Sequence, residues 1–196
     1  MGSRFPVLQT ILLFSTLAAA AAAGKNLRPE SSNDLVRKSC VNASYPEICY
    51  RTLSSYGGSA MKTPRDLAQA ALEVSLGRAA KTAEFVRSVR GESGRERAAL
   101  RDCVQEMGDA VEELRRSVAE LKHLRKGAEF EWQMSNVETW VSAALTNEDT
   151  CLDGFKEVSA AVRSDVRRKI RNMAKVTSNA LYLVNLLGSS PNNNKQ

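Results

Sequence analysis

From about residue 63 onward, apolar residues recur at the spacing of an α-helix. Within the segment 93–127, successive apolar positions lie alternately four and three residues apart, at Leu100, Val104, Met107, Val111, Leu114, Val118 and Leu121. This spacing places the side chains on one stripe of a helix and is typical of bundles and coiled coils. The segment 156–187 carries a similar stripe, at Val158, Val162, Val166, Ile170, Met173, Val176, Ala180, Leu183 and Leu187. Two long helices with one apolar face each are therefore predicted.

Capping residues indicate the limits of four long helices. Thr63-Pro64-Arg65-Asp66 combines an N-cap, a proline at the first helical position and an acid in the first turn. Ser93-Gly94-Arg95-Glu96 and Ser135-Asn136-Val137-Glu138 both have the capping-box pattern. Glycines follow the ends of the predicted helices. The predicted helices span about residues 63–90, 93–127, 135–154 and 156–187, and their short connections favour antiparallel neighbours.

The segment 33–53 is predicted to form two short helices broken around Asn42 to Pro46, because proline restricts the residue before it and does not fit mid-helix. Aromatic residues are few, and alanine, leucine, glutamate and arginine are common, which favours helices over sheets. The fold class is therefore predicted to be all-α. An up-down-up-down four-helix bundle (63–188) carries an N-terminal helical hairpin (33–53) within one domain of residues 24–188.

Residues 1–23 have the pattern of a secretory signal peptide. Arg4 gives a basic start, Val7 to Leu17 is apolar, and Ala18 to Ala23 are small residues suited to signal peptidase. The apolar run is too short to span a bilayer, and no later segment is long enough. A secreted, extracellular protein with no membrane partner is expected. Its net charge falls from +6 to +5 without this segment, and a disordered tail is predicted at 189–196.

An even number of cysteines in a secreted chain favours disulfides over metal ligands. Cys40 and Cys49 flank the break in the short hairpin, and a hairpin between the second and third long helices brings Cys103 and Cys151 to similar heights. The pairs Cys40–Cys49 and Cys103–Cys151 are favoured on this basis. The second pair closes a loop worth on the order of 4 kcal/mol in the chain-entropy model. The two crossed pairings stay open as alternatives.

The sequence lacks the groups that an enzyme needs. A hydrolase or transferase requires a nucleophile with a base, or a metal. His123 is the single histidine and falls near a predicted helix end, where it favours the helix dipole. Carboxylates such as Glu112 and Glu113 stand among arginines, which indicates salt bridges on an exposed face. No glycine-rich phosphate loop occurs, and we expect no catalytic residue, no metal and no cofactor.

Two further sequence features indicate a possible ligand and a possible modification. The basic segment Arg163 to Lys175 could hold anionic pectin, although a solvated helix face is the simpler interpretation; secretion argues against nucleic acid. Asn42-Ala43-Ser44 is a glycosylation sequon inside the small disulfide loop. Asn42 is therefore a candidate glycosylation site.

Several segments together resemble the plant invertase and pectin methylesterase inhibitor family. They are the pair Cys40-x8-Cys49, AALRDCVQEM at 98–107, NVETWVSAALTNEDTCLDGF at 136–155 and VTSNALYLVNLL at 176–187. The resemblance implies a four-helix bundle with an N-terminal hairpin and disulfides between the first and second and the third and fourth cysteines. It also implies a non-catalytic protein that forms a one-to-one complex with a cell-wall enzyme in the apoplast and covers its substrate cleft. Many members carry a fifth cysteine, which this chain lacks.

The motif around Trp140 resembles the branch that inhibits pectin methylesterase, and no Pro-Lys-Phe element of the invertase-inhibiting branch occurs. By analogy with the esterase inhibitors, we expect contacts from the polar positions of residues 136–146 and from the facing helix. The candidate partner-binding residues are Asn136, Thr139, Ser142, Thr146, Glu106 and Asp109. An acid invertase is the alternative target, and a secreted protein that binds pectate or a lipid without inhibiting an enzyme is the alternative class.

Overall fold

The computed structural model describes residues 32–57, 61–156, 158 and 160–190. Within these residues the chain forms helices and no strand. The helices are α1 (Ser32–Cys40), α2 (Pro46–Gly57), α3 (Pro64–Ser88), α4 (Gly94–Lys122), α5 (Ala128–Gly154) and α6 (Ala160–Gly188). None of the described helices is long and apolar enough to cross a membrane. The expected signal peptide at 1–23 lies outside the described residues.

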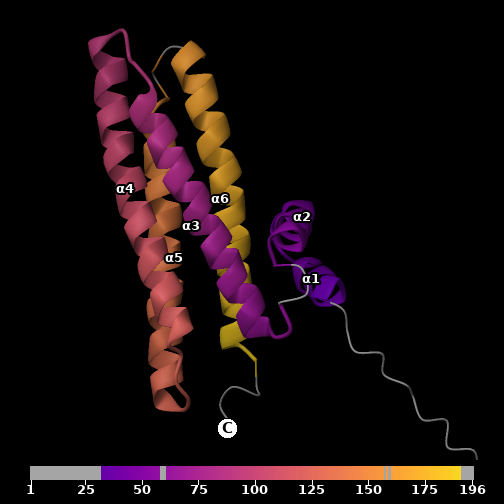
Figure 1. Ribbon diagram of the computed structural model, residues 1–196. Coiled ribbons are helices and arrows are strands. Elements are labelled where there is room, and N and C mark those ends of the chain that lie inside the picture. Colours follow the sequence, from indigo (N-terminus) through magenta and orange to yellow (C-terminus); the bar gives the residue numbers. More distant parts are fainter. Residues whose placement is uncertain (1–31, 58–60, 157, 159, 191–196) are drawn as a thin grey trace, which may run out of the picture.

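The four long helices form an antiparallel bundle. Figure 1 shows α3 to α6 running side by side, with α1 and α2 packed together against one flank. Each long helix contacts its neighbours in the cyclic order α3, α4, α5 and α6, and α6 closes the ring on α3. The short helix α2 packs on α3 and α6. The predicted all-α bundle with an N-terminal helical hairpin is thereby confirmed.

The first two long helices begin where their capping residues predict. The hydroxyl of Thr63 accepts a hydrogen bond from the backbone N–H of Asp66 (3.1 Å), and the Asp66 carboxylate accepts the N–H of Thr63 (2.9 Å). Ser93 and Glu96 form the same reciprocal pair at the start of α4. Each cap satisfies backbone donors that the helix leaves unpaired and contributes about 1 kcal/mol.

The limits of the turn between α4 and α5 differ from the prediction. The third long helix begins at Ala128, not at Ser135, and α4 ends at Lys122, not at Gly127. Ser135 lies inside α5, so its capping-box pattern is not used as a cap. The side chain of Gln133 supplies hydrogen-bond partners to the backbone of this shorter turn. The Gln133 amide accepts the N–H of Arg125 (2.7 Å) and donates to the carbonyl of His123 (3.1 Å).

The interior consists mainly of aliphatic side chains. On α4 the predicted stripe holds, with Leu100, Met107, Leu114, Val118 and Leu121 buried and Val104 and Val111 partly buried. On α5 the core positions include Val137, Val141, Ala144 and Cys151, and Trp140 is half-buried. The helix α6 ends at Gly188, one residue beyond the predicted limit of 187, and the N–H of Ser189 bonds to the carbonyl of Asn185 (3.0 Å). Residues 191–196 of the predicted tail lie outside the described residues.

Two buried disulfides cross-link neighbouring helices. Cys40–Cys49 joins α1 to α2 with a Cα–Cα distance of 5.6 Å, and Cys103–Cys151 joins α4 to α5 with a distance of 4.4 Å. These are the pairs favoured from the sequence rather than the crossed alternatives. The second pair is symmetric about the turn, since Cys103 precedes Gly127 by 24 residues and Cys151 follows it by 24. The two cysteines therefore lie at the same height in the hairpin of α4 and α5.

Candidate functional site

The polar positions nominated on α5 form a stripe along one side of the helix. Thr139, Ser142 and Thr146 are exposed, and Asn136 is half-buried. On α4, Asp109 is exposed and Glu106 is half-buried. We call these six residues, with Glu113 and Asn147 described below, the α4–α5 face.

The hydroxyl groups on α5 are held close to the helix backbone. Thr139 donates to the carbonyl of Ser135 (2.8 Å), Thr146 to that of Ser142 (3.1 Å) and Thr150 to that of Thr146 (2.8 Å). This back-bonding fixes the threonine rotamers and leaves the oxygen lone pairs and the methyl groups toward solvent. The result is an uncharged stripe whose threonine side chains have little entropy left to lose when a partner covers them.

One side-chain contact that the sequence did not suggest sets the register of α4 and α5. The amide of Asn147 donates to the carboxylate of Glu113 (3.0 Å). The contact places Thr146 at the height of Asp109 and Glu113. Asn136 lies ten residues from Thr146, about 15 Å nearer the α4–α5 turn at the rise of an α-helix. On this register Thr146 lies at a similar height to Asp109, and Asn136 lies at the far end of the face.

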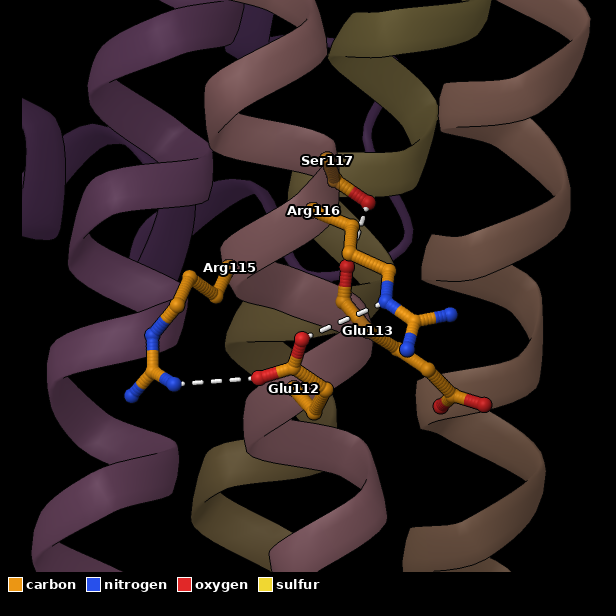
Figure 2. A network of polar contacts seen from close by, with 5 residues as sticks. All are labelled: Glu112, Glu113, Arg115, Arg116 and Ser117. Carbon is orange, nitrogen blue, oxygen red and sulfur yellow. Dashed lines mark hydrogen bonds and ion pairs between the residues drawn. The ribbon is translucent and has the colours of Figure 1, made fainter.

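The two adjacent carboxylates of α4 have different roles. Glu112 pairs with Arg115 (3.0 Å) and Arg116 (3.3 Å) on the outside of the helix, as Figure 2 shows. Glu113 points instead toward the neighbouring helix α5 (Figure 2) and is half-buried. Successive residues are turned by about 100° on a helix, which separates the pair. The salt-bridge prediction thus holds for Glu112 and is wrong for Glu113.

The carboxylates on this side of α4 act on one another. Burial raises the pKa of Glu113, and the charges of Asp109 and Glu106 raise it further. The hydrogen bond from Asn147 and the charge of Arg116 oppose this shift. Asp109 and Glu106 are thus close enough to Glu113 for their charges to act on it. The α4–α5 face thus has a negative edge on α4 and a neutral surface on α5.

Other residues singled out in the sequence lie elsewhere. Asn42 is exposed in the turn between α1 and α2, and its glycosylation stays a prediction. His123 is exposed at the end of α4 and lines an open hollow of about 330 Å³ with Trp132. Within the described residues, no group of three or more histidine, cysteine, aspartate or glutamate side chains is placed to hold a metal ion.

The described part of the basic segment on α6 is largely engaged within the protein. Arg168 pairs with Asp165 (2.9 Å), the amine of Lys169 lies over the ring of Phe85, and that of Lys175 lies over the ring of Tyr45. These contacts support the interpretation of an ordinary solvated helix face.

Comparison with known proteins identifies the family. The model of the family described as plant invertase/pectin methylesterase inhibitor matches residues 34–183, from α1 well into α6. The chain belongs to this family. Pectinesterase inhibitor 3 of Arabidopsis thaliana is 49% identical over 168 residues, which cover 82% of this chain and 82% of that protein. Pectinesterase inhibitor 9 of the same plant is 42% identical over 189 residues, covering 91% and 92%.

Solved structures of this family share the fold. The crystal structure of a mutant form of a pectin methylesterase inhibitor from Arabidopsis matches with a TM-score of 0.62 and 27% sequence identity. The match covers 75% of this chain and 93% of that chain.

In this member of the plant invertase/pectin methylesterase inhibitor family, much of the recognisable sequence serves the fold. Cys103 and Cys151 cross-link the segments 98–107 and 136–155. Asn179, in the segment 176–187, binds both backbone polar groups of Tyr45 in the α1–α2 turn. Glu148 is buried in the bundle. The exposed threonine and serine stripe of segment 136–155 has no comparable role in the fold. It therefore remains the candidate contact surface.

Proposed function

We propose that this chain is a secreted inhibitor of pectin methylesterase whose α4–α5 face covers the substrate cleft of the enzyme in a one-to-one complex. The relatives named above carry the name pectinesterase inhibitor, and the family includes inhibitors of this enzyme. The observation that carries the proposal is the stripe of Thr139, Ser142 and Thr146. All three side chains are exposed, and the hydroxyls of Thr139 and Thr146 are held by hydrogen bonds to carbonyls of their own helix.

A rigid face of this kind suits inhibition by occlusion. The Cys103–Cys151 disulfide and the Asn147–Glu113 hydrogen bond hold α4 and α5 in one register. A surface organised before binding loses less entropy in the complex, so more of the contact energy appears as affinity. The protein acts by binding, and its own side chains carry out no chemistry on pectin.

The hollow beneath α2 is too small to hold a lipid. The hollow beneath α2, lined by Leu53, Val176 and Leu183 among others, has a volume of about 10 Å³. That volume has room for one water molecule at most and none for an acyl chain.

Titration of a plant pectin methylesterase with the purified protein lacking residues 1–23 tests the proposal. Methanol release should fall to zero near one inhibitor per enzyme. Thr146→Arg should weaken inhibition strongly because it adds a long charged side chain where the stripe of α5 lies level with the carboxylates of α4. Ala119→Arg is the matched control: it adds the same charge at an exposed position of α4, six residues beyond Glu113 and turned by about 120° from it. The same titration against an acid invertase examines the other target of the family. Full esterase activity at large inhibitor excess would refute the proposal.

A further inference from the structure

A second surface, distinct from the α4–α5 face, lies where α3 passes into α4. This is the upper end of the bundle in Figure 1. An open groove of about 730 Å³ runs between the end of α3 and the start of α4. Its walls carry Arg87 and Arg90 from the α3 side and Arg97 and Arg101 from α4. We call these four residues the arginine groove.

The charges of the groove are unbalanced. One carboxylate, Asp102, lines it together with the four guanidinium groups. Within the described part of the chain, Arg87, Arg90 and Arg101 form no ion pair, and all three are exposed. Arg97 is held at the rim by a hydrogen bond to the carbonyl of Glu92 (2.7 Å). Like charges at this density repel one another, and an anion in the groove would relieve the repulsion.

Helix stability does not account for the arginines of α4. The N-terminus of a helix carries partial positive charge, so a cation in the first turns is mildly unfavourable there. Arg97 is the fourth residue of α4, so the helix dipole does not favour its charge, and Arg101 lies one turn further along. The two walls of the groove are also close together. A Cβ atom added at Gly91 would lie 2.8 Å from the backbone nitrogen of Arg97, so the connection between α3 and α4 packs against the start of α4.

The floor of the groove indicates the kind of anion. Val86, Val89, Leu100 and Val104 line it between the two arginine walls. An aliphatic floor with guanidinium groups on both sides suits a chain molecule with C–H faces and carboxylates that project at intervals. Guanidinium groups bind carboxylates in a bidentate manner and with less desolvation than ammonium groups. A compact inorganic anion would leave most of the groove empty.

We propose that the arginine groove binds de-esterified galacturonan, the polyanion that pectin methylesterase leaves behind. The choice of ligand rests on the proposed function, because the carboxylates that the groove would bind are those the target enzyme unmasks. Methyl-esterified pectin presents neutral esters and gives the guanidinium groups no charge to bind. The inhibitor would therefore collect where the enzyme has already acted, and the groove uses none of the residues of the α4–α5 face.

Binding of oligogalacturonate, measured by calorimetry in the absence of any esterase, tests this proposal. The full-length mature protein should bind the de-esterified oligomer at 0.15 M ionic strength and should not bind the same oligomer after full methyl esterification. The triple variant Arg87→Gln/Arg90→Gln/Arg101→Gln should lose at least about tenfold in affinity, because it removes three guanidinium groups that would pair with carboxylates of the oligomer. Arg97 is left intact because it bonds to the turn.

The control triple variant Arg78→Gln/Arg168→Gln/Arg171→Gln removes the same net charge from exposed positions of α3 and α6. It should bind within about twofold of the unmodified protein if the groove is a site. Equal losses in the two triple variants would show that only net charge matters and would overturn the proposal, as would equal binding of esterified and de-esterified oligomers or no binding at all. Amide NMR shifts confined to residues 86–105 on addition of the oligomer would support it without any substitution.

Inhibition and groove binding can fail separately. Loss of oligogalacturonate binding in the groove variant with unchanged esterase inhibition supports the groove and leaves the proposed function intact. Groove binding in a protein that does not inhibit any esterase refutes the proposed function alone.

Discussion

The carboxylate of Glu148 accepts a hydrogen bond from the hydroxyl of Thr177 (2.9 Å) in the centre of the bundle. The Thr177 hydroxyl lies 2.8 Å from that of Ser75, so one polar chain joins α5, α6 and α3. Glu148 is fully buried, and its second oxygen has no hydrogen-bond partner in the structure. Burial raises the pKa of Glu148 to about 8, although the hydrogen bond from Thr177 opposes the shift. The bundle thus holds a carboxylic acid that is neutral at mildly acidic pH.

The raised pKa of Glu148 predicts that the protein loses stability as pH rises. Below the unfolded-state pKa of 4.5 the group is protonated in both states, so it adds no pH-dependent contribution to the free energy of unfolding. Above it the unfolded chain ionises while the folded protein keeps its proton, so the free energy of unfolding falls until pH passes about 8. Between pH 5 and pH 8 the loss amounts to about 4 kcal/mol. Urea unfolding at both values of pH measures it.

Glu148→Gln isolates this contribution. The variant cannot titrate at this position, so the difference in its free energy of unfolding between pH 5 and pH 8 should be smaller by most of that amount. Glu73 and Glu113, whose pKa values are also shifted, titrate in both proteins and cancel in the comparison. Glu112→Gln, on the exposed outer side of α4, should keep the full pH dependence. Parallel pH dependence in the unmodified protein and in Glu148→Gln would contradict a neutral buried Glu148.

The position of Glu148 shows what the residue pattern could and could not predict. It continues the core positions Val137, Val141, Ala144 and Cys151 at the same alternating four- and three-residue spacing. The spacing places position 148 on the buried side of the helix, whereas the residue type argues against it because a glutamate is almost never fully buried. The partners that make its burial tolerable come from α3 and α6, and no local pattern indicates them.

The candidate site was predictable to a similar degree. Helical spacing and the family resemblance located the threonine stripe of α5, because both are properties of one segment. The contact between Asn147 and Glu113 depends on how α4 and α5 pack against each other, and the arginine groove depends on how α3 and α4 do. The predicted turn at 127–135 would have misplaced that register. Gln133, which closes the shorter turn, carries no capping pattern in the sequence.

The two disulfides should differ in their effect on stability. Removal of Cys103–Cys151 opens a loop with a sequence separation of 48, and removal of Cys40–Cys49 opens one of only 9. In the chain-entropy model these loops are worth about 4 and about 3 kcal/mol respectively. The double variants Cys103→Ala/Cys151→Ala and Cys40→Ala/Cys49→Ala, unfolded in urea, compare them directly. A larger loss from the shorter loop would show that the hairpin disulfide acts through native contacts rather than through the unfolded chain.

Asn179 should determine how firmly the N-terminal hairpin is attached to the bundle. Its side chain accepts the N–H of Tyr45 (3.0 Å) and donates to the carbonyl of the same residue (2.9 Å), across 134 residues of sequence. Asn179→Ala leaves both backbone groups without their partner at a cost of about 1–3 kcal/mol. Hydrogen exchange should accelerate in α1 and α2 and stay unchanged in α4 and α5. Asn185→Ala, exposed on the same helix, is the control and should not alter exchange in the hairpin.

The same glycine-to-alanine change should have opposite effects at two positions. Gly127 in the α4–α5 turn has φ +70° and ψ −145°, a region that is essentially restricted to glycine. Gly127→Ala should therefore lower the free energy of unfolding by about 1–3 kcal/mol, although a Cβ atom there would meet nothing within 4 Å.

Gly77 lies in the interior of α3, is exposed and has equally open surroundings. Gly77→Ala should raise the free energy of unfolding by up to about 1 kcal/mol because alanine restricts the unfolded chain and favours the helix. Urea unfolding of both variants at one pH gives the two signs, and a neutral Gly127→Ala would mean that the turn can relax into an ordinary conformation.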